Sequence, residues 1–198
     1  VQFGNGNYQL IDTQGRYLFA TAWPTMQTYS DNELLKVRRD DKFGFVNRRG
    51  EVVIPPQYDN AQEFGDGLAL VQQGGEAFWI DETGARVMDR PEVYRSEPFS
   101  DGLAVVWNAD NLCGLMDKQG NLLTPCQWTR LRAFSFSVDD ITLAYTEDKL
   151  AFISQQGKMI GGSPREEDTF TFGIDGEYLF LLEDGVLSIW HADGTQVY

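Results

Sequence analysis

KFGFVNRRGEVVIPPQYDNAQEFGDGLALV, residues 42–71, contains segments that recur along the whole chain. Its ending GLALV at 67–71 returns as GLAVV at 102–106 and as TLAYT at 142–146. The most regular marker is one glycine per copy, found at Gly15, Gly50, Gly84, Gly120, Gly157 and Gly194. The spacings of these glycines are 35, 34, 36, 37 and 37 residues. The chain is therefore a tandem repeat with a period of about 35 residues.

A polar residue stands three positions before each of these glycines, at Asp12, Asn47, Asp81, Asp117, Ser154 and His191. Asp, Asn or Ser at the first position of a type I turn, with Gly at the fourth, is a preferred combination. Glycine is used where φ is positive because it has no Cβ to clash. The pattern predicts a hairpin turn at each marker, and it assigns the single histidine, His191, to turn capping instead of catalysis.

Two apolar residues come directly before each polar turn residue, as in Phe45-Val46 and Phe152-Ile153. Neighbouring residues of a strand point to opposite faces of the sheet, so both faces of these strands are predicted to be buried. The apolar runs around them predict an all-β fold of tandem three-stranded antiparallel meanders, without helices. The predicted units are 33–54, 67–88, 102–124, 142–160 and 177–198, in one domain over 1–198 that begins with a capping hairpin at 7–19.

One such unit is too small to be stable alone, because ordering its backbone costs more free energy than its few apolar side chains return on burial. The units must therefore stack on one another. Two arrangements satisfy this requirement, namely an open stacked array or a closed, five-bladed ring like a propeller. The irregular segment 20–32 and the hairpin that ends at Tyr198 are typical of array caps and favour the open array.

Aromatic residues recur in the connections between units. Tyr58, Tyr94 and Trp128 each lie three residues after a proline, and this recurrence predicts that they fill the space between neighbouring meanders. Trp23 and Trp107 depart from that pattern, since Trp23 lies in the irregular segment and Trp107 follows a strand. Exposed aromatics are typical of binding surfaces, so Trp23 and Trp107 are the candidate surface binding residues.

Cysteine and charge suggest no catalytic or metal centre. Cys113 and Cys126 flank one predicted hairpin closely enough for a disulfide, although a buried thiol at Cys113 fits the pattern slightly better. The basic residues Arg38, Arg39, Lys42, Arg48 and Arg49 lie at the two ends of one strand, so they are predicted to be two groups of solvated charges. Acidic pairs at Asp139-Asp140, Glu147-Asp148, Glu166 to Asp168 and Glu183-Asp184 are likewise expected to favour solubility.

The stretch 42–71 resembles the bacterial WG repeat, also called the KWG repeat, nearly throughout. Its form is G-x-W/K-G-Φ-I-D-x-x-G-x-Φ-Φ-I-P-x-x-Y-D followed by A-x-x-F-x-x-G-L-A-x-V. The resemblance continues well over 76–106, partly over 112–146, in outline over 150–182, and in the hairpin part at 186–197. The name-giving Trp-Gly pair is replaced by Phe43-Gly44, Ala77-Phe78 and Cys113-Gly114. The resemblance implies an all-β repeat protein that mediates interactions, with no enzymatic activity and no cofactor.

Composition narrows the remaining function classes. The 198 residues include 16 Lys and Arg against 30 Asp and Glu, a net charge of −14. That acidity argues against a nucleic-acid partner, because phosphate backbones bind basic faces. One His and two Cys are too few for a structural zinc site, and no apolar run is long enough to span a membrane. The chain opens at Val1 without a visible signal peptide, so we expect a processed or trimmed chain.

The expected function is that of a non-enzymatic interaction or scaffold module that binds a protein partner. The alternative is a carbohydrate- or cell-wall-binding domain that uses the exposed aromatics Trp23 and Trp107. No catalytic, cofactor-binding or metal-binding residue is predicted. The sequence leaves the compartment open, with a lean towards the bacterial periplasm or cell envelope.

Overall fold

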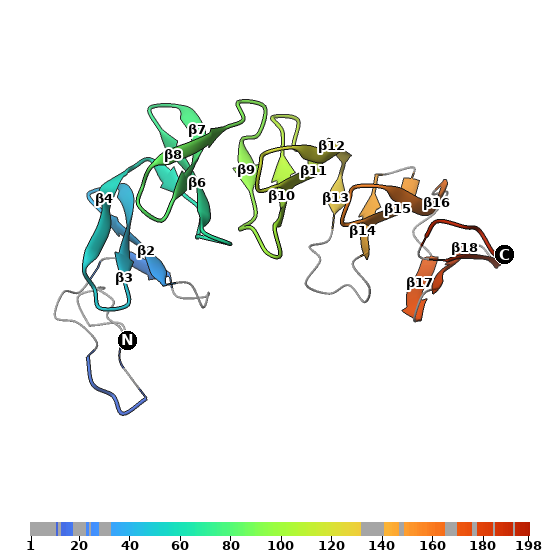
Figure 1. Cartoon of the computed structure of the whole chain (residues 1–198), viewed down its shortest axis with the longest axis horizontal. Coiled ribbons are helices and arrows are strands. Elements are labelled where there is room, and N and C mark those ends of the chain that lie inside the picture. Colours follow the sequence, from blue (N-terminus) through green and yellow to red (C-terminus); the bar gives the residue numbers. More distant parts are fainter. Residues whose placement is uncertain are drawn as a thin grey trace. The chain divides into compact units, whose positions relative to one another are not determined.

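The computed structural model describes residues 11, 13–17, 23, 25–27, 33–131, 141–146, 149–164, 170–175, 178–183, 185–191 and 193–198. All of these residues lie in strands, turns or loops (Figure 1). The predicted all-β fold is confirmed. Over the described ranges, no helix is long and apolar enough to cross a membrane.

The strands form small antiparallel sheets in which chain neighbours pair. The first sheet contains β1 (Thr25–Gln27), β2 (Leu34–Arg39), β3 (Lys42–Asn47) and β4 (Val52–Tyr58). The second contains β5 (Asn60–Ala61), β6 (Leu68–Gln73), β7 (Glu76–Asp81) and β8 (Arg86–Asp89). After the short strand β9 (Arg95–Ser96), the third sheet has β10 (Leu103–Trp107), β11 (Cys113–Asp117) and β12 (Leu122–Trp128).

The last two sheets follow the same order. One contains β13 (Arg130–Leu131), β14 (Ile141–Tyr145), β15 (Lys149–Ser154) and β16 (Met159–Pro164). The other contains β17 (Phe170–Asp175), β18 (Tyr178–Glu183) and β19 (Val186–His191). The first four predicted meanders are present, whereas the fifth sheet adds β17 before β18 and has no third strand after β19.

The two ends differ from the regular unit. In the predicted unit 177–198, the segment after the last turn forms no strand, and it contacts β19 through a bridge between Trp190 and Gln196 and through backbone hydrogen bonds of Ile189 with Val197 and Tyr198. Of the predicted hairpin at 7–19, the described part includes an antiparallel bridge between Ile11 and Tyr17. The remaining residues of that hairpin lie outside the described residues.

The six marker glycines adopt the predicted conformation, with φ between 77° and 96°. The amide of Gly50 donates a hydrogen bond to the Asn47 carbonyl at 2.9 Å, and the turns at 81–84, 117–120, 154–157 and 191–194 repeat this bond. The Asn47 Oδ1 atom accepts the amides of Arg49 and Glu51 at 2.9 and 3.0 Å. The predicted turn chemistry is therefore confirmed, including capping by the polar side chain.

Replacing one marker glycine tests this assignment. Gly50→Val is expected to lower the free energy of unfolding by about 1–2 kcal/mol, because a left-handed conformation is costly for a residue with a branched Cβ. Urea denaturation followed by tryptophan fluorescence would measure the loss. An unchanged denaturation midpoint would contradict the role of the positive φ of 78° at Gly50.

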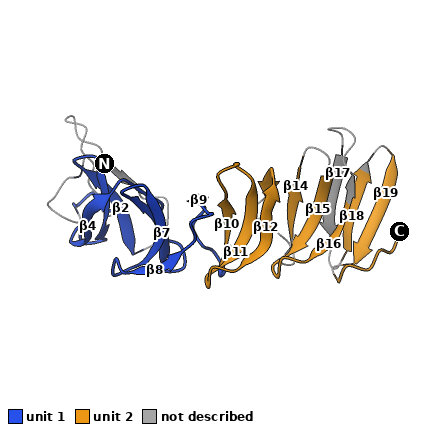
Figure 2. Cartoon of the chain, turned by 90° about the horizontal axis from the view of Figure 1, so that it is seen from above, with its two compact units in different colours: residues 1–102 blue, residues 103–198 orange. Residues whose placement is uncertain are grey.

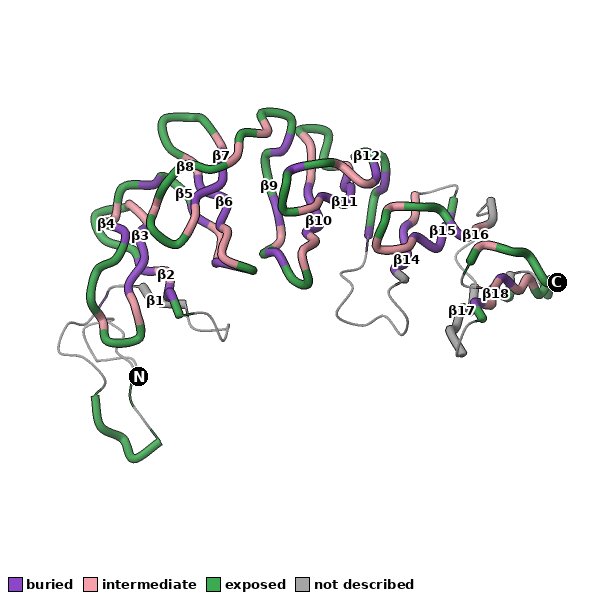
Figure 3. Tube along the Cα trace, in the orientation of Figure 1, coloured by how far each residue is buried: buried purple, intermediate pink, exposed green. Residues whose placement is uncertain are grey.

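Both faces of the central strands are buried, as predicted from the paired apolar residues (Figure 3). Phe45 belongs to a core cluster that joins the first sheet to the second through Phe64 and Ile80. Its neighbour Val46 lies on the opposite face, in a cluster with Trp23. Alternation along the strand therefore supplies a core on each side, and successive sheets share these cores.

Gly44 lies opposite a bulge in β4. Phe43 pairs with Tyr58 while Phe45 pairs with Ile54, so residues 55–57 are all opposite one glycine. A Cβ on Gly44 would lie 2.6 Å from the Ile54 carbonyl oxygen, far inside a normal contact. Because Gly44 has no side chain, β3 can pack closely against the bulge of β4.

The third sheet has the same close approach at its equivalent glycine, Gly114. A Cβ on Gly114 would lie 2.6 Å from the carbonyl oxygen of Thr124 in β12. In the second sheet Phe78 takes the glycine position, and it pairs directly with Asp89. Among these three sheets, the glycine of the Trp-Gly motif is therefore found where three residues of the third strand lie opposite it.

The chain divides into two compact units, residues 1–102 and 103–198 (Figure 2). The first unit contains the two sheets formed by β1–β8, and the second contains the three sheets formed by β10–β19. The single domain expected over 1–198 stays a prediction, as does the choice between an open array and a closed ring.

Candidate functional site

The polar turn residues have structural roles. The Asp81 carboxylate accepts hydrogen bonds from the hydroxyl and amide of Thr83 and from the amide of Ala85, at 2.6 to 3.0 Å. The Nδ1 atom of His191 accepts the amide of Asp193 at 3.3 Å. His191 therefore caps its turn, as the sequence predicted. The described residues contain no group of three His, Cys, Asp or Glu side chains that could hold a metal ion.

Capping also makes stability depend on pH. The Thr83 hydroxyl bond, with the backbone amides of residues 83–85, lowers the pKa of Asp81. A carboxyl with a lowered folded pKa stabilises the fold above its unfolded value of about 3.9, and that contribution is lost as the pH falls through the folded pKa. We expect Asp81→Asn to flatten this part of the thermal stability profile below about pH 4. An acid-induced loss of Tm equal to that of the parent chain would contradict this assignment.

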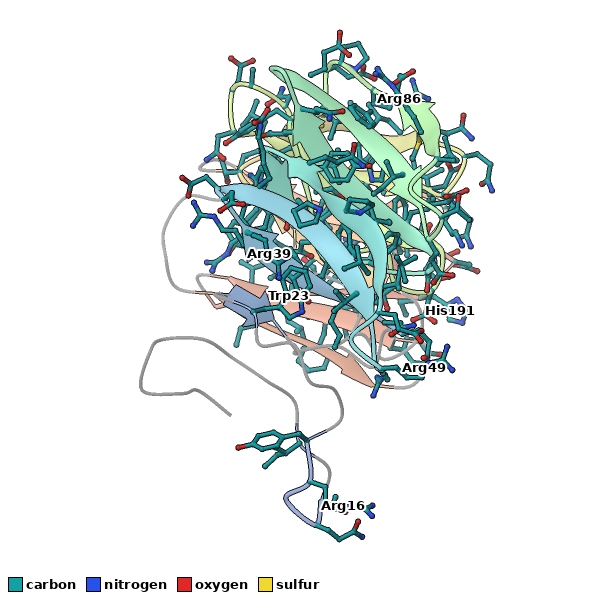
Figure 4. The ribbon with its side chains drawn as sticks, turned by 90° about the vertical axis from the view of Figure 1, so that its left-hand side faces the viewer. Arg16, Trp23, Arg39, Arg49, Arg86 and His191 are labelled. Carbon is teal, nitrogen blue, oxygen red and sulfur yellow. The ribbon has the colours of Figure 1, made fainter. Side chains whose placement is uncertain are left out.

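Trp23 is buried, so its predicted surface position is wrong. The side chain is 1% exposed and packs with Leu35, Val37 and Val46 on the outer face of the first sheet. The guanidinium of Arg39 lies over its ring, 4.2 Å from the centroid (Figure 4). The buried face of β2 and β3 needs an apolar cover, and Trp23 provides it from an irregular segment.

Trp107 is half-buried at the end of β10 and packs against the core of the third and fourth sheets. Trp128 is buried in that core, as predicted. Cys113 and Cys126 are both thiols, with Cys113 buried in the same core. Because β12 bulges opposite Gly114, Cys113 pairs with Trp128.

The basic residues form two separate groups, as predicted, and three of the five are in ion pairs. Arg38 pairs with Asp41 at 2.6 Å, and Lys42 pairs with Asp59. At the other end of β3, Arg49 pairs with Glu51 at 3.0 Å. These cations therefore do not form one anion site. The predicted acidic pairs at 139–140, 147–148 and 166–168, with residue 184, lie outside the described residues.

Tyr94 departs from the predicted role of the connection aromatics. Tyr58 and Trp128 are buried, but Tyr94 is 48% exposed. The third strand of its meander, β8, ends at Asp89, and a turn in which the Val93 amide donates to the Arg90 carbonyl follows. Val93 then takes the fully buried position. The shorter strand thus releases the Tyr94 ring to the surface.

Tyr94 lines a small hollow with Arg95 in the first unit. The hollow has a volume of about 170 Å³ and is open to solvent. Its other lining residues are Asn60, Ala61, Gln62, Leu70 and Gln72. It therefore combines an exposed aromatic ring, a guanidinium and three amide side chains around a small apolar floor.

Hydrogen bonds and charge position the rim of this hollow. The Gln72 amide nitrogen donates to the Tyr94 carbonyl at 3.4 Å, which ties the connection to β6. Beside it, burial raises the pKa of Glu97, and the positive charge of Arg95 opposes that shift. The Ser96 hydroxyl donates to the Glu97 carbonyl at 2.6 Å. Side chains that donate to main-chain carbonyls thus hold this segment, while Tyr94 stays accessible.

Sequence reasoning missed this hollow because it treated the three connection aromatics as equivalent. The available signal was the residue directly before the proline of each connection. Two copies have a β-branched residue there, Ile54 and Thr124, whereas the copy that contains Tyr94 has Arg90 after Met88 and Asp89. A charged residue there indicates that the third strand ends early. That difference could have separated Tyr94 from Tyr58 and Trp128.

Comparison with known proteins identifies the repeat. The family model of the WG containing repeat matches residues 43–76 and 114–137. Two segments of the chain match the WG repeat. The two matched segments include β3 to β6 and β11 to β13, so the WG match covers strands of both units. No curated protein matches the chain.

The fold of this chain is similar to that of several solved structures. Hsv2p of Kluyveromyces lactis is 13% identical, with a TM-score of 0.52 over 89% of this chain and 65% of that chain. Hsv2 of Kluyveromyces marxianus is 14% identical, with a TM-score of 0.50 over 89% and 63%. BamB from Moraxella catarrhalis is 13% identical, with a TM-score of 0.46 over 98% and 70%. The chain thus spans less than two thirds of the two Hsv2 chains, and the likeness concerns the fold alone.

Proposed function

We propose that this WG-repeat chain is a non-enzymatic interaction module that binds a peptide segment of a protein partner at the Tyr94 hollow. The observation that carries the proposal is the exposure of Tyr94 at a position that is buried in two other repeats. Exposing an aromatic ring to water costs free energy that burial would recover. A partner that covers Tyr94 recovers it.

The composition of the hollow supports a protein ligand. Tyrosine and arginine are enriched among the residues that contribute most to protein interfaces, and here Tyr94 and Arg95 are adjacent. The amides of Asn60, Gln62 and Gln72 can each donate and accept hydrogen bonds with a peptide backbone. The hollow is smaller than the roughly 300–1,000 Å³ of a typical small-molecule site, and a single side chain of a partner fits it better.

Selection from a peptide library tests the proposal directly. The whole chain, immobilised, is panned against a phage-displayed library of random peptides, and the affinities of enriched peptides are measured by calorimetry. Tyr94→Ala is expected to weaken binding at least about tenfold, or about 1.4 kcal/mol. Tyr198→Ala, which removes an even more exposed tyrosine far along the sequence, is the control and is expected to bind like the parent chain.

The same variants separate the two candidate ligand classes. The carbohydrate alternative rested on Trp23 and Trp107, and the burial of Trp23 removes one of those two residues from the surface. A glycan array that binds the parent chain but not Tyr94→Ala would favour a carbohydrate ligand over a peptide. Failure to enrich any peptide, or peptides that bind Tyr94→Ala as tightly as the parent, would contradict the proposal.

A further inference from the structure

The charge on the lining of the Tyr94 hollow comes from Arg95. The other lining residues are three amides, two aliphatic residues and Tyr94 itself. None of these described lining residues carries a carboxylate that could neutralise the guanidinium from inside the hollow. Since Arg95 is exposed, a ligand that enters the hollow meets a positive charge.

A second basic side chain contacts the floor of the hollow from behind. Lys36 of β2 donates from its Nζ atom to the Ala61 carbonyl at 3.0 Å. Burial lowers the pKa of Lys36, and the nearby Glu63 carboxylate opposes that shift. Because Glu63 offsets the charge of Lys36, we assign the main electrostatic contact with a ligand to Arg95.

Several hydrogen-bond acceptors of the lining are already in use. Each of four oxygens accepts a bond from within the chain, namely the carbonyls of Ala61, Leu70 and Tyr94 and the Oδ1 atom of Asn60. The Arg95 guanidinium, in contrast, has five N–H donors and no acceptor. A ligand that brings acceptor atoms therefore suits this lining better than a ligand that brings donors.

A carboxylate is the peptide group that fits a guanidinium best. The planar fork of arginine binds both oxygens of a carboxylate through two parallel hydrogen bonds, which a lysine ammonium cannot reproduce. Arg95 already interacts with Glu97, whose pKa is raised by burial. Glu97 does not line the hollow, and five donors allow Arg95 to bind a second carboxylate on the side of the hollow.

We propose that the Tyr94 hollow binds an acidic peptide, in which the carboxylate of an Asp or Glu side chain pairs with the Arg95 guanidinium. A neighbouring apolar side chain of the peptide covers the Tyr94 ring. This inference rests on the peptide-binding function proposed above. Long-range attraction does not produce such a preference, because the net charge of −14 on the chain favours basic peptides.

Parallel peptide selections on the parent chain and on Arg95→Gln test the inference. Peptides selected on the parent chain are expected to share an Asp or Glu residue that peptides selected on Arg95→Gln lack. Arg48→Gln is the matched control, since Arg48 is an exposed cation of the same unit that does not line the hollow. It is expected to select the same acidic peptides as the parent chain.

Calorimetry on one selected peptide measures the pairing itself. Replacing its acidic residue by the matching amide is expected to weaken binding to the parent chain at least about tenfold. The same replacement is expected to weaken binding to Arg95→Gln less than about threefold, because the partner of the carboxylate is already gone. Arg95→Lys keeps the charge without the fork, and it is expected to bind the acidic peptide with intermediate affinity.

The outcomes separate this inference from the proposed function. Peptides that require Tyr94 but carry no acidic residue would overturn the inference and leave the proposed function intact. An amide replacement that weakens binding to the parent chain and to Arg95→Gln equally would do the same. Acidic peptides that require Arg95 but bind Tyr94→Ala like the parent chain would support the pairing and contradict the role of Tyr94.

Failure to enrich any peptide on the parent chain would overturn both proposals. Circular dichroism establishes that each variant is folded. Should Arg95→Gln fail to fold, Arg95→Lys takes its place, and equal affinity of Arg95→Lys and the parent chain for the acidic peptide would then overturn the inference.

Discussion

Gly44→Ala is expected to lower the free energy of unfolding by about 3 kcal/mol, at the upper end of what overpacking usually costs. The added Cβ would lie 2.6 Å from the Ile54 carbonyl oxygen and from the Pro56 nitrogen, and 2.8 Å from the Pro55 carbonyl carbon. All three neighbours are backbone atoms, so no side-chain rotation relieves the contact. The bulge of β4 must shift, and with it the buried Tyr58 that follows. Urea denaturation would measure the loss.

Gly67→Ala is the control for Gly44→Ala. Gly67 has a φ of 82° and nothing within 4 Å of an added Cβ. Its replacement is expected to cost only the backbone strain of a left-handed residue, about 1–2 kcal/mol. If Gly44→Ala proved no more destabilising than Gly67→Ala, steric exclusion by the bulge would not be the reason for the glycine in the repeat.

Trp23→Ala is expected to destabilise the first sheet by about 3–5 kcal/mol, the usual cost of removing a large buried aromatic. Its loss would expose Leu35, Val37 and Val46, which form one face of β2 and β3. It would also remove the ring under the Arg39 guanidinium. Denaturation monitored by circular dichroism would report the loss, because the first sheet shares its core with the second.

Two further variants test the reason for this effect. Trp23→Phe is expected to lose less than half as much stability as Trp23→Ala, because the buried indole nitrogen has no hydrogen-bond partner to lose among the described residues. Trp107→Ala, at a half-buried position, is expected to cost less than Trp23→Ala. Equal losses at the two tryptophans would mean that Trp23 does not cover the sheet.

The regular features of this chain were predictable because they depend on local chemistry. The turn glycine Gly50 and its capping partner Asn47 lie within one turn of the chain. The sequence pattern is therefore enough to predict the turn. Strand alternation is equally local, and the pair Phe45-Val46 correctly indicated two buried faces. The repeat period then placed the meanders, and the family resemblance was confirmed by the match to the WG containing repeat.

The candidate site was predicted poorly because it depends on departures from the repeat. Trp23 lies outside any regular element in the sequence, and its burial follows from the need to cover the first sheet. Tyr94 shares its spacing from proline with Tyr58 and Trp128, yet the early end of β8 leaves it exposed. Exposure of a side chain depends on what packs over it, and spacing along the chain does not report that.

Local chemistry in the sequence thus accounts for the turns, the strands and the order of the meanders, and it carries the resemblance to the WG repeat. These features need only neighbouring residues and a period of about 35. The burial of Trp23 and the exposure of Tyr94 appear only after the sheets have packed. Burial is a property of contacts between segments that lie far apart in the sequence, and both features lie where the regular contact of the repeat is replaced or missing.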